Sequence, residues 1–415
     1  MIDPVLHESV LAYLEDRLDG YLAILKSWVE INSFTSNAGG VNALGAETGS
    51  IFAGLGFAAE RVPSVTHGFG DHLVLTRAGA GGPVIGLVSH LDTVFPPDEE
   101  TANEFAWRVD GERVFGPGTV DIKGGTLVIY MMLDALRKFR PEVFNRVAWT
   151  ILLDASEETL SNDFGTLCTE RLTGAAACLV FEGGFYENGT FRLVHRRKGM
   201  AKFRIRSSGR AAHAGVAHGD GANAIVGVAD VVRSVADLTD YGREITFNIG
   251  VISGGTVSNR VPHNAEALGE MRAFDADVFQ EGLLKLSGLG GDGLTVPGGN
   301  SCEIAVEVLD TTPPWPENPE TERLLEIWTR SAEALGFRIV PEARGGLSDG
   351  NHTWSWIPTL DGLGPSGGNA HCSEQVPERG KEQEYLYVPS LIPKTVLNLV
   401  AILELAESTQ SVPTL

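Results

Sequence analysis

Cysteine is scarce in this sequence. Its 415 residues include four cysteines, and none of them form a Cys-x-x-Cys pair. A disulfide framework is therefore not expected, and a reducing cytoplasm is the simplest location. The N-terminal stretch MIDPVLHESVLAYLEDRLDG carries acidic residues where a signal peptide would need positive charge followed by an unbroken apolar core. We therefore expect a cytoplasmic protein whose residues 1–31 form an amphipathic first helix.

Positive charge is also in short supply. Lys and Arg number 32 against 54 Asp and Glu, which gives a formal net charge of −22. Nucleic acids and anionic membranes attract basic faces, so neither is expected as a partner. No run approaches the roughly 18 uninterrupted apolar residues of a membrane span. A composition of 43% hydrophobic and 21% charged residues is that of a globular protein, long enough for two domains with full cores.

Short apolar runs alternate with helical stretches between about residues 80 and 200. The runs PVIGLVSH, RVAWTILLDAS and AACLVFEGG are typical of buried strands, and the stretches GGTLVIYMMLDALRKF and FGTLCTERL are typical of helices. Buried strands that alternate with helices indicate an α/β domain. We expect a mixed, mostly parallel sheet with helices on both faces.

A different pattern begins near Arg197. KGMAKFRIRSSG alternates like a strand, NAIVGVADVVRSVADL has helical spacing, and four more segments continue the series. The predicted order is strand, helix, strand, strand, helix, strand, which is that of a ferredoxin-like α+β domain. The proline-rich TTPPWPENPET is typical of a linker. We therefore predict one discontinuous large domain, residues 1–195 and 311–415, with an inserted domain at residues 196–310.

Polar side chains follow three of the predicted strands. His90 and Asp92 follow VIGLVS, Glu157 and Glu158 follow VAWTILLDAS, and Glu182 follows AACLVF. Side chains two apart on an extended segment point the same way, so the carboxylate of Asp92 could orient the imidazole of His90, as for a metal-bound histidine. Ligands collect outside the carboxyl ends of parallel strands. The alternative for each strand end is a solvated polar turn.

Two further candidates lie in glycine-rich segments. Asp121 is in GPGTVDIKGG just before a predicted helix, where it could also be a simple N-cap. This segment lacks the Gly-Lys-Ser/Thr ending of a phosphate-binding loop. His371 is in DGLGPSGGNAHCSEQ, where glycine lets the backbone approach a ligand closely, although a single histidine there could be an ordinary loop residue.

As a set, these side chains can hold two metal ions. The ligands would be His90, Glu182 and Asp121 for one ion and His371, Glu158 and the same, bridging Asp121 for the other. With a shared water each ion is four-coordinate and keeps an exchangeable position, as in catalytic zinc sites. Four positive charges against three carboxylates leave one positive charge, which favours a metal-bridged hydroxide over water. Glu157 is then available as the general base.

Five motifs carry a resemblance to a known family. SHLDTV, GPGTVDIKGG, DASEET, VFEGG and GNAH, in this order, resemble the di-zinc metallopeptidases that include carboxypeptidase G, acetylornithine deacetylase and succinyl-diaminopimelate desuccinylase. DGLGP and GGLSDGN look most like the carboxypeptidase G branch. The resemblance covers most of the chain and implies a zinc-exopeptidase-like fold with an inserted lid and dimerisation domain. It also implies the five ligands named above, support of His90 by Asp92, proton transfer by Glu157 and a cis peptide bond after Asp121.

The resemblance further implies roles in the inserted domain and beyond it. GRAAHAG places His213 as a hydrogen-bond donor to the oxyanion in the active site of a partner subunit. GGTVSNRVP and GEMRAFD place Asn259 and Arg272 as a polar and a cationic substrate contact, and RGGLSDGN brings the amides of Gly345 and Gly346 to the substrate. Taken alone, His213 could be a surface residue and Arg272 an exposed arginine on a strand.

Two departures from the family pattern stand out. LDTTPPW has threonines where a glutamate-preferring relative would have a further arginine, which puts strict C-terminal glutamate specificity in doubt. Cys372 follows the predicted ligand His371 where many relatives have serine, and we expect this thiol to be a bystander rather than a ligand.

The sequence therefore predicts a di-zinc hydrolase that cleaves an amide or peptide bond next to a free carboxylate, with Co²⁺ or Mn²⁺ as substitute metals. An N-acyl-amino-acid deacylase of the deacetylase or desuccinylase type is the alternative, and a non-catalytic binding homologue is a third. The expected partners are a small peptide or N-acyl amino acid as substrate and a second copy of the chain, which would form a homodimer through the lid domain.

Overall fold

The computed structural model describes residues 4–159, 161, 163–295 and 300–408. The chain divides into two compact units. The large unit comprises Met1–His195, Glu317–Glu342 and Ser348–Leu415, and the small unit comprises Arg196–Pro316 and Ala343–Leu347. Compared with the boundaries expected from the sequence, the small unit also takes in residues 311–316 and 343–347.

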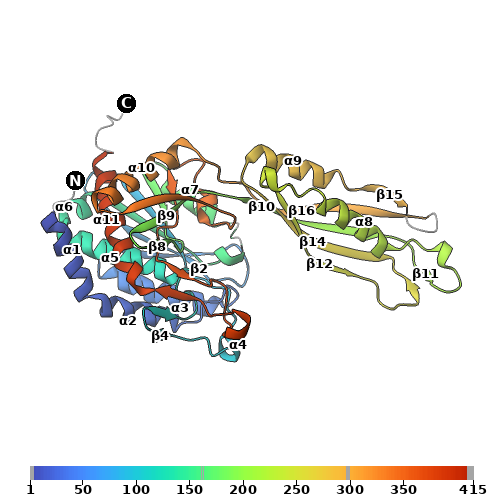
Figure 1. Ribbon diagram of the computed structural model, residues 1–415, viewed down its shortest axis with the longest axis horizontal. Coiled ribbons are helices and arrows are strands. Elements are labelled where there is room, and N and C mark those ends of the chain that lie inside the picture. Colours follow the sequence, from blue (N-terminus) through green and yellow to red (C-terminus); the bar gives the residue numbers. More distant parts are fainter. Residues whose placement is uncertain (1–3, 160, 162, 296–299, 409–415) are drawn as a thin grey trace. The chain divides into compact units, whose positions relative to one another are not determined.

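A six-stranded sheet forms the centre of the large unit (Figure 1). Its strands, in spatial order, are β1 (Ala58–Pro63), β2 (Asp71–Arg77), β6 (Ala148–Asp154), β3 (Val84–His90), β7 (Ala177–Val180) and β18 (Thr359–Leu360). Strand β3 pairs in parallel with β6 and β7, β18 pairs in parallel with β7, and the β1–β2 and β2–β6 pairs are antiparallel. The predicted mixed, mostly parallel sheet is confirmed.

Helices cover both faces of this sheet. Leu87 and Leu153 belong to the core that also contains the helices α5 and α11, whereas their chain neighbours Val88 and Leu152 belong to the core that contains α7. Such alternation of buried side chains between two cores is what a doubly covered sheet requires. The helices of the large unit are α1 (Pro4–Asp16), α2 (Leu18–Val29), α3 (Ala38–Ala53), α4 (Pro97–Ala102), α5 (Lys123–Phe139), α6 (Pro141–Arg146), α7 (Phe164–Leu172), α10 (Pro319–Ala334) and α11 (Leu391–Ser408).

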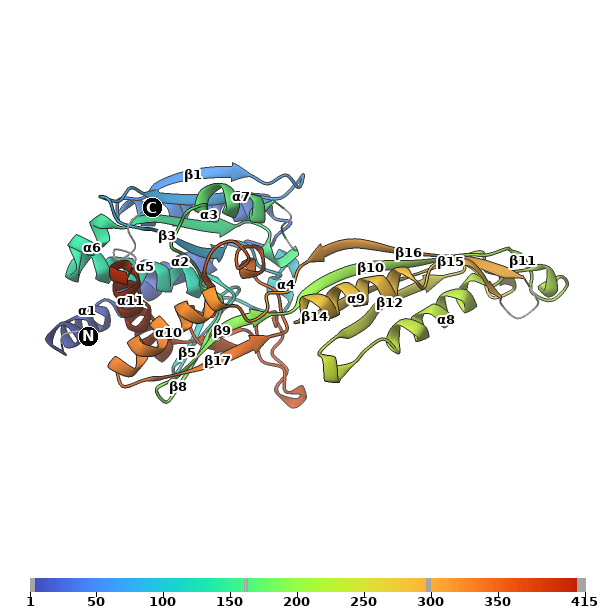
Figure 2. The ribbon, with the colours of Figure 1, turned by 90° about the horizontal axis from the view of Figure 1, so that it is seen from above.

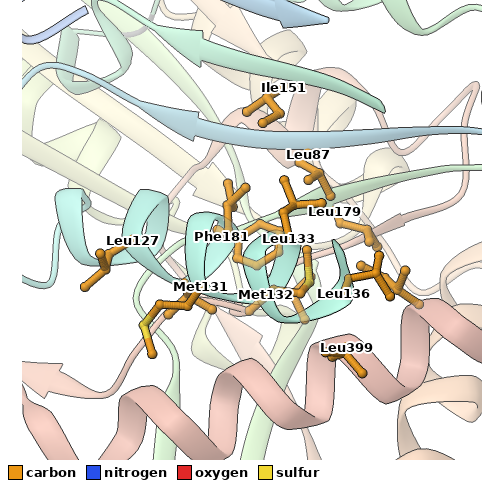
Figure 3. Close-up of a cluster of buried hydrophobic side chains, with 14 of the residues drawn as sticks. Leu87, Leu127, Met131, Met132, Leu133, Leu136, Ile151, Leu179, Phe181 and Leu399 are labelled. Atoms are coloured by element: carbon orange, nitrogen blue, oxygen red, sulfur yellow. The ribbon is translucent and has the colours of Figure 1, made fainter. Parts of the chain in front are cut away.

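Helix α5 is buried on nearly every side. It lies between the sheet and α11, and its leucine and methionine side chains fill the space between them (Figure 3). Only Arg137 and Lys138, near its C-terminal end, are exposed, so most of its surface packs against other elements. The segment Val388–Ser408, which contains α11, is apolar and long enough to cross a membrane by composition alone, with a mean hydropathy of 1.5, but 67% of its apolar window is buried within the protein. Packing in the core accounts for its hydropathy.

Two small sheets complete the large unit. One contains β19 (Gly367–Gly368), β20 (Tyr385–Tyr387), β5 (Arg113–Phe115) and β4 (Arg108–Asp110), and the other contains β17 (Arg338–Arg344), β9 (Thr190–Arg197) and β8 (Phe185–Glu187). The first sheet brings residues near position 115 beside residues near position 385. This pairing positions part of the candidate site described below.

The small unit has the predicted ferredoxin-like order with one added strand. Its sheet, in spatial order, contains β12 (Thr246–Gly254), β14 (Asn264–Ala273), β10 (Gly199–Ser208), β16 (Ser301–Thr312) and β15 (Gly291–Thr295), with the short pair β11 (Ala212–His213) and β13 (Arg260–Val261) nearby in sequence. Helices α8 (Ala224–Ala236) and α9 (Ala276–Ser287) pack on one face of this sheet (Figure 2). Strand β15 was not predicted, because its segment GDGLT carries two glycines and shows no alternation.

Two local expectations are wrong in part. The single N-terminal helix is in fact two, α1 and α2, separated at Arg17. The proline-rich linker is a packed connection, because Trp315 is completely buried and exchanges two backbone hydrogen bonds with Arg197. Proline content alone did not distinguish a solvated linker from an irregular but buried segment.

Candidate metal centre

The carboxyl ends of three adjacent parallel strands carry the predicted ligands. His90 is the last residue of β3, Glu182 follows β7 by two residues, and Glu158 lies in a short 3₁₀ turn (Glu157–Thr159) after β6. Because β3 lies between β6 and β7, the three side chains emerge at one edge of the sheet. The topology thus brings together groups separated by up to 92 positions in the sequence.

Asp121 reaches this edge from the loop before α5. The helix takes Ile122 as its N-cap, and that cap makes no side-chain hydrogen bond, so Asp121 does not act as a helix cap. The Asp121–Ile122 peptide bond is cis, as the family resemblance implies. A side chain at Gly125 would collide with the carbonyl oxygen of Phe181, which explains why glycines follow Asp121: they let the start of α5 approach the end of β7.

The two carboxylate oxygens of Asp121 face two different histidines. Oδ1 lies 3.2 Å from Nε2 of His90, and Oδ2 lies 3.3 Å from Nε2 of His371. Each histidine also faces a second carboxylate: Nε2 of His90 is 3.8 Å from Oε1 of Glu182, and Nε2 of His371 is 3.1 Å from Oε2 of Glu158. The side chains therefore fall into the two predicted groups, which share Asp121.

These separations fit a pair of divalent cations. A tetrahedral zinc ion with ligand bonds of about 2.0–2.1 Å holds its donor atoms about 3.3–3.4 Å apart, which is close to most of the distances above. Donor atoms of His90, Asp121 and Glu158 also lie within 4.8 Å of one another. Oε1 of Glu158 is buried without a hydrogen-bond partner among the described residues, as expected of an oxygen that coordinates a cation when one is bound.

Asp92 holds the first histidine from behind. Its Oδ1 lies 3.3 Å from Nδ1 of His90, and its backbone oxygen is 3.0 Å from the same nitrogen. The carboxylate also accepts hydrogen bonds from the backbone N–H groups of Glu157 and Glu158, at 3.1 and 3.3 Å. Thr35 donates its hydroxyl to Oδ2 of Asp92 at 2.6 Å. Asp92 thus fixes the ring of His90 and the turn that carries the two glutamates.

The electrostatics reflect crowded carboxylates. Burial alone would raise the pKa of Asp121, but hydrogen bonds from His371 and His90 lower that pKa below its usual range. Hydrogen bonds to Asp121 and Glu158 raise the pKa of His371 to about 11. Without metal, protons on the imidazoles of His90 and His371 partly balance the negative charge of the neighbouring carboxylates. A divalent cation that binds the same donor atoms has to displace those protons.

Glu157 differs from the other carboxylates of the site. It lies in none of the close contacts between histidine and carboxylate described above, and its backbone N–H is held by Asp92. Burial raises the pKa of Glu157 well above its usual value; the charge of His90 opposes this shift, and those of Glu182 and Glu158 add to it. A carboxyl group with a raised pKa is suited to proton transfer near neutral pH.

Two residues of this site were missed in the sequence. Thr35 reaches Asp92 across 57 positions, and Glu384, which is completely buried, accepts backbone hydrogen bonds from Val120 and Asp121 across more than 260 positions. Neither lies in a motif or in a recognisable spacing. The predicted bystander Cys372 directs its thiol to the carbonyl oxygen of Glu374, 3.7 Å away.

The remaining predicted residues belong to the small unit. His213 and Asn259 are exposed on and beside the short strands β11 and β13, and the backbone carbonyl of Asn259 accepts a hydrogen bond from Ala214. The guanidinium group of Arg272 donates to Glu270 and to the carbonyl oxygen of Gly345, and Gly346 accepts from Arg197. The structure thus shows the carbonyls of these two glycines in use, whereas the sequence led us to expect a role for their amides. Their roles toward a substrate stay predictions.

Comparisons with known proteins support the family resemblance. The sequence profile of the peptidase dimerisation domain matches residues 195–285. Carboxypeptidase G2 of Pseudomonas is 30% identical over 271 residues, 65% of this chain and 64% of that protein, so the match spans less than two thirds of the relative. Acetylornithine deacetylase of Klebsiella pneumoniae is 28% identical over 292 residues, 66% of this chain and 72% of that protein.

Solved structures extend the likeness to the whole fold. A dinuclear metal-binding peptidase of the M20 family from Bacillus subtilis superposes with a TM-score of 0.66 at 15% identity, covering 98% of this chain and 99% of that one. The protein therefore has the fold of the M20 metallopeptidases. It contains a peptidase dimerisation domain and is a homologue of carboxypeptidase G2 and acetylornithine deacetylase, which confirms the resemblance carried by its motifs.

Proposed function

We propose that this protein is a metal-dependent hydrolase that cleaves an amide or peptide bond next to a free carboxylate, with two zinc ions at the centre described above. The observation that carries the proposal is Asp121, whose two oxygens each face a histidine at 3.2–3.3 Å. An isolated ion pair would need one histidine. Two histidines on opposite oxygens of one carboxylate are the arrangement of a bridged pair of cations.

Each residue has a defined task in this reaction. His90, Glu182 and Asp121 would hold one ion, and His371, Glu158 and Asp121 the other. When bound, the two ions lower the pKa of a water molecule and polarise the carbonyl group of the substrate. Asp92 keeps Nε2 of His90 directed at the centre by holding Nδ1 from the opposite side of the ring.

Glu157 would move the protons. Its carboxylate takes a proton from the attacking water and later gives it to the leaving amine, which needs one group that is able to act as base and then as acid. The raised pKa of Glu157 suits both tasks. Its position is fixed by the hydrogen bond from its backbone N–H to Asp92, so the carboxyl group does not depend on a ligand bond for its placement.

The small unit would complete the site from a second copy of the chain. The match to a peptidase dimerisation domain supports a homodimer, and His213 would donate a hydrogen bond to the oxygen that becomes negative as the carbonyl carbon turns tetrahedral. Arg272 would bind the substrate carboxylate, and Asn259 and the amides of Gly345 and Gly346 would make further contacts to the substrate. His213→Ala should lower the rate and leave zinc content unchanged; a fully active monomer would contradict a shared site.

A deacylase of N-acyl amino acids is the second candidate, favoured by the similarity to acetylornithine deacetylase. The zinc-loaded protein is assayed against dipeptides with varied C-terminal residues and against N-acetyl and N-succinyl amino acids. Turnover of dipeptides with little deacylation supports the carboxypeptidase proposal, and the reverse preference supports a deacylase. No hydrolysis in either set, with no zinc bound, would indicate a non-catalytic binding homologue.

A further inference from the structure

Glu384 lies outside every motif but touches the loop of the bridging ligand. It precedes β20 and is completely buried. Its Oε1 accepts hydrogen bonds from the backbone N–H groups of Val120 at 2.9 Å and Asp121 at 3.2 Å. Its backbone carbonyl accepts another from the N–H of Gly116, at the start of the same loop. Three bonds therefore tie the Asp121 loop to one residue.

The same residue also holds the loop of the second histidine. The backbone N–H of Glu384 donates to the carbonyl oxygen of Cys372 at 2.8 Å, and Cys372 directly follows His371. The neighbouring Gln383 donates its side-chain amide to the carbonyl oxygen of Ser373 at 3.1 Å. Residues 383 and 384 therefore connect the chain around His371 to the chain around Asp121.

His371 needs such support more than His90 does. His90 ends a central strand and is 1% exposed, and Asp92 contacts its ring. The side chain of His371 is 53% exposed on a loop, and the residue itself has a positive φ of 67°. A positive φ is uncommon for a residue other than glycine and persists only where the surroundings impose it. Contacts to this loop therefore decide where Nε2 of His371 lies.

We propose that Glu384 is a positioning residue, which holds the shared ligand Asp121 and the loop ligand His371 at the spacing that two metal ions require. The inference rests on the proposed two-metal function. Removing the carboxylate would leave the N–H groups of Val120 and Asp121 without their acceptor, and the loop would shift to find another. The ion held by His371, Glu158 and Asp121 should suffer most, because Asp92 still fixes the other histidine.

Zinc titration of the metal-free full-length protein tests this proposal, with the affinity of each ion and kcat measured together. Glu384→Ala should lower the affinity for the ion at His371 by about 10–100-fold and lower kcat. The affinity for the ion at His90 should change much less. Glu384→Gln keeps an acceptor oxygen and should restore both affinities to near the wild-type values. Glu378→Ala, an exposed glutamate of the same segment, is the matched control and should change nothing.

Several outcomes would overturn the inference. Unchanged zinc affinities in a folded Glu384→Ala protein would overturn it. Equal losses of zinc affinity in Glu384→Ala and Glu384→Gln would also overturn it, because the charge of Glu384 rather than its hydrogen bonds would then matter. If the alanine variant does not fold, Glu384→Asp replaces it. The shorter side chain withdraws the acceptor oxygen by about 1.5 Å, so the affinity for the ion at His371 should again fall. Wild-type protein that binds no zinc would instead refute the proposed function.

Discussion

The two halves of the candidate metal centre contain the same kinds of ligand but are built in opposite ways. One half has His90 at the end of a central strand, with 1% of its side chain exposed and a carboxylate behind its ring. The other half has His371 on a loop, with 53% of its side chain exposed and a positive φ. The sheet positions the first histidine, and long-range contacts to a loop position the second.

The His90 half of the centre is therefore expected to be rigid, and the His371 half to be the more mobile one. A strand end in a close-packed core has few alternative positions. A loop opens locally at a lower free-energy cost than a core strand, so the His371 half is the one expected to release its ion first and to admit substrate.

Removal of metal should have the largest effect. A strong chelator should abolish turnover, and the loss of zinc should occur in two steps, with the ion on the exposed His371 side leaving before the ion on the His90 side. Bound zinc per chain and activity are followed together over time, and zinc is then added back to restore both. Loss of both ions in one step would show that the two halves do not differ, and activity without metal would refute the proposed chemistry.

Replacement of the proton carrier should come next. Glu157→Gln removes the proton-transfer group without removing a ligand, so both zinc ions should remain while kcat falls by about 10²–10⁴-fold. Metal content and kcat are measured on the same preparation. Glu170→Gln, an exposed glutamate on α7, serves as the control. Retained activity in Glu157→Gln would remove this residue from its proposed role.

Weakening the support of His90 should chiefly affect the ion bound by His90, whereas the Glu384 variants should chiefly affect the ion bound by His371. Asp92→Asn should reduce the affinity of the ion at His90 by about 10–100-fold. The ion at His371 should weaken less, because Asp92 reaches its ligand Glu158 only through a backbone hydrogen bond of 3.3 Å. Thr35→Val removes one hydrogen bond to Asp92 and should have a smaller effect in the same direction. Calorimetric zinc titration resolves the two ions. Equal weakening of both ions would contradict separate support of the two halves.

The smallest effect concerns the scaffold behind the His90 half. Buried His72 lies 3.1 Å from Asp154, the last residue of β6, and 3.2 Å from Asp163. Burial alone would lower the pKa of His72, but these two carboxylates raise it overall. The group therefore stabilises the fold fully below its unfolded pKa of about 6.5, and this stabilisation is lost as the pH rises through the higher folded pKa.

Denaturant unfolding of metal-free protein tests this pH dependence. The unfolding free energy of wild type should exceed that of His72→Gln by on the order of 1–3 kcal/mol at a pH of about 5.5, and the gap should narrow at a pH of about 8.5. His67→Gln changes an exposed histidine and should show no such trend. A gap that stays constant with pH would show that His72 does not carry a charge in the folded protein.

Much of this architecture was readable in the sequence, and the His90 half shows why. Apolar runs identified β3, β6 and β7, parallel pairing implied a common edge, and a separation of two residues predicted the contact between Asp92 and His90. All of these follow from local periodicity and one rule of sheet topology. The same periodicity predicted the principal strands and helices of the small unit.

The His371 half was not accessible in this way. His371 became a candidate through glycine content and family resemblance, because no periodic pattern places a loop residue. Glu384 and Thr35 act through tertiary contacts across 263 and 57 positions, which local sequence patterns do not encode. Strand β15 and the buried Trp315 were missed for a related reason, since glycine and proline obscure the local signal while distant packing determines the structure.

A crystal structure of the zinc-loaded protein, with anomalous diffraction at the zinc absorption edge, would show whether two ions share Asp121. Two strong peaks are expected on either side of Asp121, one contacted by His90 and Glu182 and the other by His371 and Glu158. A single peak, or zinc bound away from Asp121, would contradict a carboxylate shared between two ions.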